Sequence, residues 1–219
     1  NPVGQDSAGE ERRVNALGCF REHRDVDDIT DGQPDVAYAV VGYQDAGRRC
    51  AGRQAQQHGQ IETVLRHAAT WVEAQKVEGL KLEIVRLPGR TPVLFFDIPA
   101  TRVGSTQTIL MYGHMDKQPE FTGWRNDLGP WTPKYEDGKL YGRGGADDGY
   151  AVYASIAAVQ ALKAQKVAHP RIVGLVETCE ESGSYDLLPY VDALRPRLGD
   201  VSLVICLDSG AGNYDQLWL

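Results

Sequence analysis

Five residues that can bind a metal ion or carry a proton follow short apolar runs in the chain. If the fold brings them together, the carboxylates raise one another's pKa values unless protons or cations neutralise them. A divalent metal ion is the simplest neutraliser, so the sequence predicts a metal site. In chain order the residues are His114 and Asp116 after the run 109–112, Glu180 and Glu181 after 172–176, and Asp208 after 201–207.

The first apolar run is followed by a histidine and an aspartate two positions apart. In extended backbone His114 and Asp116 point to the same side of the strand. Asp116 is therefore placed to accept the second ring N–H of a metal-bound His114 and to fix its tautomer. Taken alone, the motif more often marks a strand end with a hydrogen-bonded histidine that binds no metal.

A glycine-rich stretch, residues 142–149, has the outline of a dinucleotide-binding loop. The last position of its Gly-x-Gly-x-x-Gly pattern is Asp147, which would repel a pyrophosphate, so we exclude a dinucleotide site. The stretch instead supplies Asp147 as a further candidate metal ligand. The alternative is a flexible turn in which Asp147 or Asp148 caps the helix that follows.

The paired glutamates allow a division of labour. One can bind metal while the other, pointing elsewhere, takes a proton from metal-activated water. The alternative is a solvated acidic turn. The remaining histidines lie in polar or helix-surface contexts and are interpreted as surface residues: His23, His58, His67 and His169.

Hydropathy patterns indicate the elements that position these residues. Helical periodicity covers 60–75 and 151–165, and Pro88-Gly89 separates two alternating runs, 80–87 and 93–98, which predict a hairpin. The three apolar runs read as strands buried on both faces. We therefore expect an α/β fold with a mixed, largely parallel sheet flanked by helices, whose strand ends gather the candidate site.

Composition excludes several classes of function. The net charge of −7 offers no basic surface for nucleic acid, and no apolar run approaches the roughly 20 residues that cross a bilayer. The polar start does not resemble a secretory leader, so we expect a cytoplasmic protein. The four cysteines form no Cys-x-x-Cys pair, and we interpret Cys179 and Cys206 as small buried hydrophobes.

Together these motifs resemble the carnosinase and aminoacylase family of di-zinc metallopeptidases, and most closely the cytosolic non-specific dipeptidases. The resemblance runs from about residue 61 to 219. It implies a zinc-exopeptidase-like catalytic domain. The motifs that carry it are Tyr112-Gly113-His114-Met115-Asp116, Gly123-Trp124, Gly138-Lys139-Leu140-Tyr141-Gly142-Arg143-Gly144 leading into Asp147-Asp148, Glu180-Glu181-Ser182-Gly183-Ser184, and Asp208.

The resemblance also implies a role for each site residue. By this likeness, His114 and Asp208 bind one zinc ion, Glu181 binds the other, Asp147 bridges both through a cis link to Asp148, Glu180 is the general base, and Asp116 orients His114. The implied reaction is zinc-dependent hydrolysis of the amide bond of dipeptides or short peptides by metal-activated water. A homodimer is implied as a possible assembly of the complete protein.

Two alternatives stay open beside the dipeptidase. One is an N-acyl amino acid deacylase of the same family, and the other is a catalytically incompetent, truncated fragment that binds metal or a partner. Gly149-Tyr150 replaces the lysine and glycine that the family commonly has after its aspartate pair.

The resemblance also divides the chain. We assign no role to residues 1–57 and interpret 58–219 as the N-terminal half of a metallopeptidase catalytic domain, without the lid domain. In the family, the last histidine ligand comes from the downstream half. A complete site would hold two zinc ions (Zn2+), and we expect this chain to bind one tightly and to expose apolar sheet surface.

Overall fold

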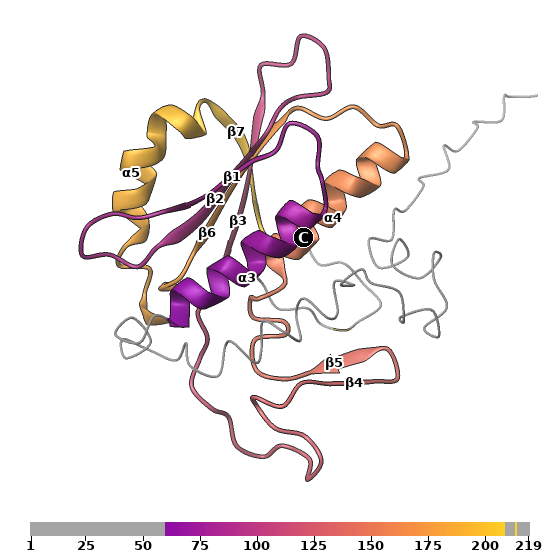
Figure 1. Ribbon diagram of the computed structural model, residues 1–219, viewed down its shortest axis with the longest axis vertical. Helices are drawn as coiled ribbons and strands as arrows, with labels where there is room; N and C mark the ends of the chain where they lie inside the picture. Colours follow the sequence, from indigo (N-terminus) through magenta and orange to yellow (C-terminus); the bar gives the residue numbers. More distant parts are fainter. Residues whose placement is uncertain (1–59, 209–212, 214–219) are drawn as a thin grey trace, which may run out of the picture. The chain divides into compact units, whose positions relative to one another are not determined.

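The computed structural model describes residues 60–208 and residue 213, so the unassigned segment 1–57 lies outside the described residues. Figure 1 shows a sheet with helices on both faces and a small separate hairpin. The elements are α3 (Gln60–Ala74), β1 (Lys81–Val85), β2 (Val93–Ile98), β3 (Thr108–His114), β4 (Lys134–Glu136), β5 (Lys139–Tyr141), α4 (Ala151–Ala164), β6 (Arg171–Glu177), the 3-10 turn η3 (Glu180–Ser182), α5 (Leu187–Leu198) and β7 (Val201–Cys206).

The main sheet has the strand order β1-β2-β6-β3-β7. β1 with β2 and β2 with β6 are antiparallel, whereas β3 is parallel to both β6 and β7. The predicted hairpin and the predicted mixed sheet flanked by helices are confirmed, with two of the four pairings parallel. Because β6, β3 and β7 run in the same direction, their carboxyl ends meet at one edge, where ligands gather in open α/β sheets.

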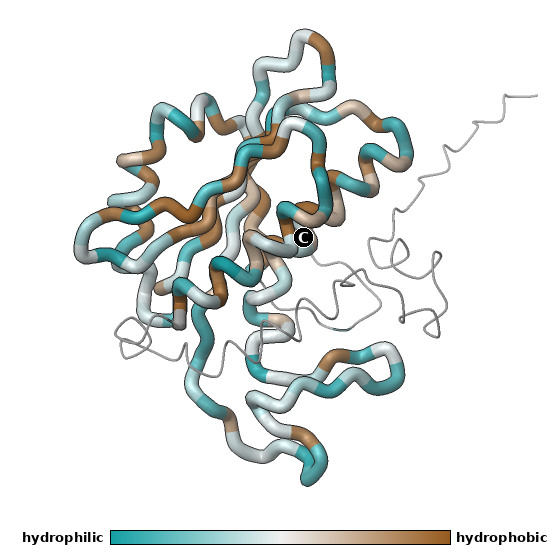
Figure 2. Tube along the Cα trace, viewed as in Figure 1, coloured by the Kyte–Doolittle hydropathy of each residue, from teal (hydrophilic) through white to brown (hydrophobic). Residues whose placement is uncertain are grey.

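Alternating side chains divide the core between the two faces of the sheet. Leu94 and Phe96 of β2 face α3 and α4, whereas Val93 and Phe95 face α5. Figure 2 shows apolar residues concentrated along the strands and the inner sides of these helices. Gly174 of β6 makes room for the Phe96 ring, because a Cβ atom there would lie 2.0 Å from the ring. Among the described residues, no helix is long and apolar enough to cross a membrane.

The prediction that β7 is buried on both faces is wrong. Leu203 and Val204 are 52% and 55% exposed, and Cys206 is exposed, whereas Cys179 is buried as predicted. The reason is that β7 pairs with β3 alone among the described strands, and the residues of α5 pack on β2 and β6 instead. The expected exposure of apolar sheet surface is therefore found on this strand.

Two further differences concern local structure. No element was predicted for residues 115–150, yet β4 and β5 pair there around Asp137-Gly138, whose φ angles are +51° and +74°. An Asp-Gly pair with positive φ at both positions is a signal for a two-residue hairpin turn. His169 is 6% exposed rather than a surface residue, because its backbone and ring are held beside Thr101 and Pro170.

Candidate metal centre

His114 lies at the carboxyl end of β3 and is fully buried. Its backbone N–H donates to Asp148 Oδ2 at 3.0 Å, which fixes the strand end against the start of α4. The preceding residue must be small, because a Cβ atom on Gly113 would lie 2.4 Å from the Cβ of Ala151 and 2.6 Å from Asp148 Oδ2. The sequence Gly113-His114 thus permits the close approach that holds the imidazole in place.

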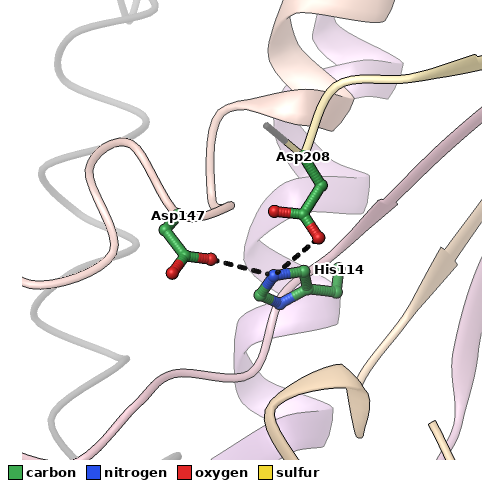
Figure 3. A group of neighbouring side chains, drawn as sticks. All are labelled: His114, Asp147 and Asp208. Atoms are coloured by element: carbon green, nitrogen blue, oxygen red, sulfur yellow. Dashed lines mark hydrogen bonds and ion pairs between the residues drawn. The ribbon is translucent and has the colours of Figure 1, made fainter. Parts of the chain in front are cut away.

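The two nitrogens of the His114 ring face different groups. Nδ1 lies 3.2 Å from the carbonyl oxygen of Asp116 and 3.4 Å from its carboxylate, so Nδ1 carries a hydrogen and Nε2 is the nitrogen left for a metal ion or a second proton. Figure 3 shows Nε2 directed toward two carboxylates: Asp147 Oδ1 at 3.1 Å and Asp208 Oδ2 at 3.8 Å. With this orientation, the Nε2 of a deprotonated ring could bind a metal ion.

The electrostatics of the ring reflect the surrounding acids. Burial alone would lower the pKa of His114, but the hydrogen bond and charge of Asp116 outweigh it, and the pKa rises to about 9. In the metal-free protein a proton therefore occupies the position that a cation would take. A metal ion at Nε2 replaces this proton, so metal binding and proton release are coupled.

Asp116 joins the end of β3 to the turn that carries the paired glutamates. Its carboxylate is almost fully buried and accepts the backbone N–H of Glu180 at 3.1 Å and that of Glu181 at 2.9 Å. The same carboxylate faces the His114 ring. One side chain therefore sets the position of the imidazole and of both glutamates, which extends the orienting role predicted for it.

The paired glutamates follow β6 on η3. Glu180 Oε2 lies 3.8 Å from His114 Nε2, and burial raises the pKa of the Glu180 carboxyl. Burial and then the charge of Asp147 raise the pKa of Glu181. Glu181 Oε2 accepts a hydrogen bond from Gln118, but Oε1 is buried without a partner among the described residues. A buried oxygen of this kind fits a cation, and it argues against a freely solvated acidic turn.

The two aspartates of the glycine-rich stretch point to different places. Asp147 is 59% exposed and reaches His114, and the peptide bond to Asp148 is cis, as the resemblance implies. Asp148 is buried, and this burial raises the pKa of its carboxyl to about 7. Neither aspartate caps α4 with its side chain, because the N-cap residue is Tyr150 and no side-chain cap bond forms. The capping alternative is therefore wrong for both residues.

Two overlapping groups of side chains meet the geometric requirements for a metal ion. His114, Asp147 and Asp208 place one ligand atom each within 4.8 Å of one another, and so do His114, Glu180 and Glu181. The first group is the set predicted for one zinc ion. The second group differs from the predicted second zinc site. It places Glu181 with His114 and Glu180, whereas the prediction pairs Glu181 with Asp147. The donor set of one imidazole and several carboxylates suits zinc.

A buried glutamate that the sequence pattern did not single out lies next to the site. Glu177, the last residue of β6, accepts hydrogen bonds from Tyr112 Oη at 2.6 Å, from Ser184 Oγ at 2.9 Å and from Cys179 Sγ at 3.2 Å. It therefore links β3 to residues on both sides of η3. Its position at the end of an apolar run was a signal for it, but its cross-strand partner was not visible in the sequence.

Comparisons with known proteins match the segment that carries these residues. The sequence profile described as peptidase family M20/M25/M40 matches residues 110–215. A Beta-Ala-His dipeptidase from Homo sapiens is 40% identical over 93 residues, which are 41% of this chain and 18% of the relative. A succinyl-diaminopimelate desuccinylase from Dechloromonas aromatica is 32% identical over 153 residues, which are 67% of this chain and 37% of the relative.

The fold is also similar to that of a solved structure. The crystal structure of human carnosine dipeptidase 1 superposes with a TM-score of 0.63 at 24% identity, covering 85% of this chain and 38% of that one. The matched regions are thus well under half the length of these relatives. All the predicted site residues fall inside the segment that the profile matches. Residues 110–215 of this chain belong to peptidase family M20/M25/M40.

Proposed function

We propose that this chain contributes the zinc-binding half of a hydrolase that cleaves the amide bond of dipeptides or other short peptides. The observation that carries the proposal is the His114 ring, whose Nδ1 is held by Asp116 while Nε2 faces Asp147, Asp208 and Glu180. This arrangement is what a carboxylate-oriented histidine ligand requires. The family of the segment and the similarity to a Beta-Ala-His dipeptidase favour the same reaction.

The described residues suffice to name the groups that would hold the metals. His114, Asp208 and the bridging Asp147 would hold one zinc ion, and Asp147 with Glu181 would contribute to a second. When bound, the metals would polarise the scissile carbonyl and make water a better nucleophile near neutral pH. The unpartnered Oε1 of Glu181 and the partly exposed Asp147 leave donor atoms available for that purpose.

Glu180 is the candidate for proton transfer. Its side chain is 33% exposed, so it can reach both water and substrate, and its backbone is fixed by Asp116. Burial raises the pKa of its carboxyl, which brings the carboxylate closer to the basicity that a general base needs. In this role Glu180 takes the proton of the attacking water and delivers it to the departing amine.

The test separates metal binding from chemistry. In a complete, zinc-loaded protein that contains this chain, replacement of Glu180 by alanine should lower kcat for a dipeptide such as β-alanyl-histidine by roughly a hundredfold or more, with zinc content near normal. Glu73→Ala, an exposed glutamate on α3, is the matched control and should change neither quantity. Loss of zinc in Glu180→Ala would make Glu180 a ligand, and unchanged kcat would refute the proposed base.

A deacylase is the second candidate, and a specific observation favours it. The similarity to the succinyl-diaminopimelate desuccinylase extends over 153 residues of this chain, compared with 93 for the Beta-Ala-His dipeptidase from Homo sapiens. Both reactions hydrolyse an amide and would use the same residues. Parallel assays with β-alanyl-histidine and with an N-succinyl amino acid would distinguish them by the ratio of kcat/KM.

A further inference from the structure

The carbonyl group of Leu207 lies just beyond the end of β7, in the peptide bond that leads into the candidate ligand Asp208. The N–H of Leu207 donates to the carbonyl oxygen of Tyr112 on β3 at 3.4 Å, so the parallel pairing of the two strands extends to this residue. In a parallel ladder, the carbonyl of Leu207 would then accept from the backbone N–H two positions after Tyr112 on β3. That N–H belongs to His114.

The start of α4 replaces this ladder bond with two others. The N–H of His114 donates instead to Asp148 Oδ2 at 3.0 Å. The carbonyl oxygen of Leu207 accepts a hydrogen bond from the hydroxyl of Tyr150, the N-cap residue of α4. Because a carbonyl oxygen only accepts, the phenol is the donor. Asp148 and Tyr150 thus supply the acceptor and the donor that the two strand ends no longer offer each other.

The position of Asp208 depends on this second bond. Within the residues that the structure describes, the pairing of β7 with β3 ends before Asp208. The carbonyl of Leu207 and the N–H of Asp208 share one planar peptide group, so the Tyr150 hydroxyl fixes the plane from which Asp208 extends. Asp208 Oδ2 lies 3.8 Å from His114 Nε2 (Figure 3). Two ligand atoms of one tetrahedral zinc ion, with bonds of about 2.0–2.2 Å, lie roughly 3.3–3.6 Å apart, so this placement needs little adjustment.

The phenol that makes this bond is a departure from the family's common pattern. Where the family commonly has glycine, this chain has Tyr150, and glycine has no side chain that could reach the Leu207 carbonyl. Tyr153 lies three positions further along the same helix, but its Oη is buried without a partner among the described residues. The bond to the residue before Asp208 is therefore particular to Tyr150.

We propose that Tyr150 is a positioning residue of the metal centre, whose hydroxyl holds the Leu207 carbonyl and thereby directs Asp208 toward the ion. The inference rests on the zinc site proposed above. In this role the phenol contacts neither metal nor substrate. Its loss should therefore weaken zinc binding without removing a ligand.

The test measures the zinc affinity of the 219-residue chain by competition with a chromogenic chelator. Tyr150→Phe removes one oxygen atom and keeps the packing of the ring. It should weaken zinc binding by roughly tenfold, the lower end of the range for losing a group that supports a metal ligand. Urea unfolding of the same variant in the presence of a chelator shows that it is folded and measures any change in its stability.

Two other tyrosines provide matched controls. Tyr153→Phe removes a hydroxyl that has no partner among the described residues, so it should lower neither zinc affinity nor stability. Tyr190→Phe removes a hydrogen bond outside both ligand groups, in which the Tyr190 Oη accepts the N–H of Leu87 at 2.9 Å. This variant should lower the urea midpoint and leave zinc affinity unchanged. A purely structural role of Tyr150 would give the same result as Tyr190→Phe, and this would overturn the proposal.

A double-mutant cycle tests whether Tyr150 acts through Asp208. Asp208→Ala removes the ligand but leaves the group of His114, Glu180 and Glu181, so weaker zinc binding should remain measurable at higher zinc concentrations. Adding Tyr150→Phe to this variant should change the affinity by less than about twofold, because no ligand is left to position. A tenfold loss in this background as well would overturn the proposed route through Asp208.

The outcomes also separate this inference from the proposed function. If the wild-type chain binds zinc and Tyr150→Phe binds it equally well, the role of Tyr150 is overturned and the metal centre stands. A wild-type chain that binds no zinc would refute the zinc site itself, and this inference with it. If Asp208→Ala alone abolishes zinc binding, the comparison of Tyr150→Phe with Tyr190→Phe decides.

Discussion

The Asp116 carboxylate should make the stability of the metal-free chain depend on pH. It raises the pKa of His114 to about 9, compared with the ordinary value of 6.5. A raised folded-state pKa contributes stability that is fully present below pH 6.5 and is lost as the pH rises through 9. Between pH 7 and 8.5 the histidine is largely neutral in the unfolded chain but largely protonated in the folded one. Folding therefore takes up a proton, which becomes less favourable as the pH rises. The contribution of His114 to the free energy of unfolding should fall by about 1.5–2 kcal/mol over this range.

The perturbation that tests this linkage is Asp116→Asn. The neutral amide removes the charge that holds the proton on His114, so the contribution from this pair should become nearly independent of pH in the same window. Overall stability at pH 7 should also fall by roughly 2–4 kcal/mol, because the N–H groups of Glu180 and Glu181 lose a charged acceptor. Urea unfolding at pH 7 and 8.5 in the presence of a chelator measures both effects.

The pH range and a control variant separate the titration of His114 from that of other groups. The carboxyl of Asp148 has its pKa raised to about 7 by burial, so it titrates mainly at and below the lower end of the window. Asp97→Asn removes a carboxylate that pairs with Arg171 outside the site, and it should keep the wild-type pH dependence. If Asp116→Asn and the wild type lose the same stability between pH 7 and 8.5, Asp116 does not hold the proton on His114.

Three further predictions concern the metal, the packing and the edge of the sheet. Asp147→Ala should abolish tight zinc binding, measured by competition with a chromogenic chelator, whereas Asp192→Ala on the exposed face of α5 should not; full retention of zinc would refute the bridging role. Gly113→Ala should destabilise the chain by about 1–3 kcal/mol in urea unfolding, whereas Gly129→Ala, with its nearest contact at 3.9 Å, should cost far less. The exposed apolar strand β7 should make the chain self-associate, and Leu203→Lys should reduce this association in sedimentation experiments because it places a charge on the strand; a wild-type chain that stays monomeric, or unchanged association in the variant, would refute this role of β7.

The site was predictable because parallel strands bring their ends together. His114 pairs with Glu177 in register, and Tyr112 pairs with Cys206, so the residues just beyond each strand must meet. Apolar runs and the acids that follow them are visible in any sequence. The direction of the strands was therefore enough to predict that His114 and the two groups of candidate ligands lie at one edge of the sheet.

Burial and hydrogen-bond partners were less predictable. An apolar run such as that of β7 indicates a strand, but it does not say which of its faces another element covers. His169 was interpreted as a surface residue, although it lies between Ala168 and Pro170 in the sequence and is held inside beside Thr101 and Pro170. Glu177 was not singled out, since its hydrogen-bond partner Tyr112 lies on another strand.

The strand order explains why one histidine takes part in both candidate ligand groups. α4 connects β3 to β6 on one face of the sheet, and α5 connects β6 to β7 on the opposite face. Crossovers between parallel strands are right-handed, so helices on opposite faces move the chain in opposite directions along the sheet. β6 therefore lies on one side of β3 and β7 returns to the other, as the order β6-β3-β7 records.

This reversal makes β3 the central strand of the site. Neighbouring strands are about 4.8 Å apart, so a residue at the end of β3 lies within reach of groups following both neighbours, whereas those groups are roughly 10 Å from each other before the loops bend inward. His114 can thus face Glu180 on one side and Asp208 on the other, at 3.8 Å from each. An imidazole in the middle and carboxylates on both sides is the arrangement that allows a single ring to organise the whole acidic cluster. The order of the motifs along the chain does not reveal it, because the faces covered by α4 and α5 decide which strand becomes central.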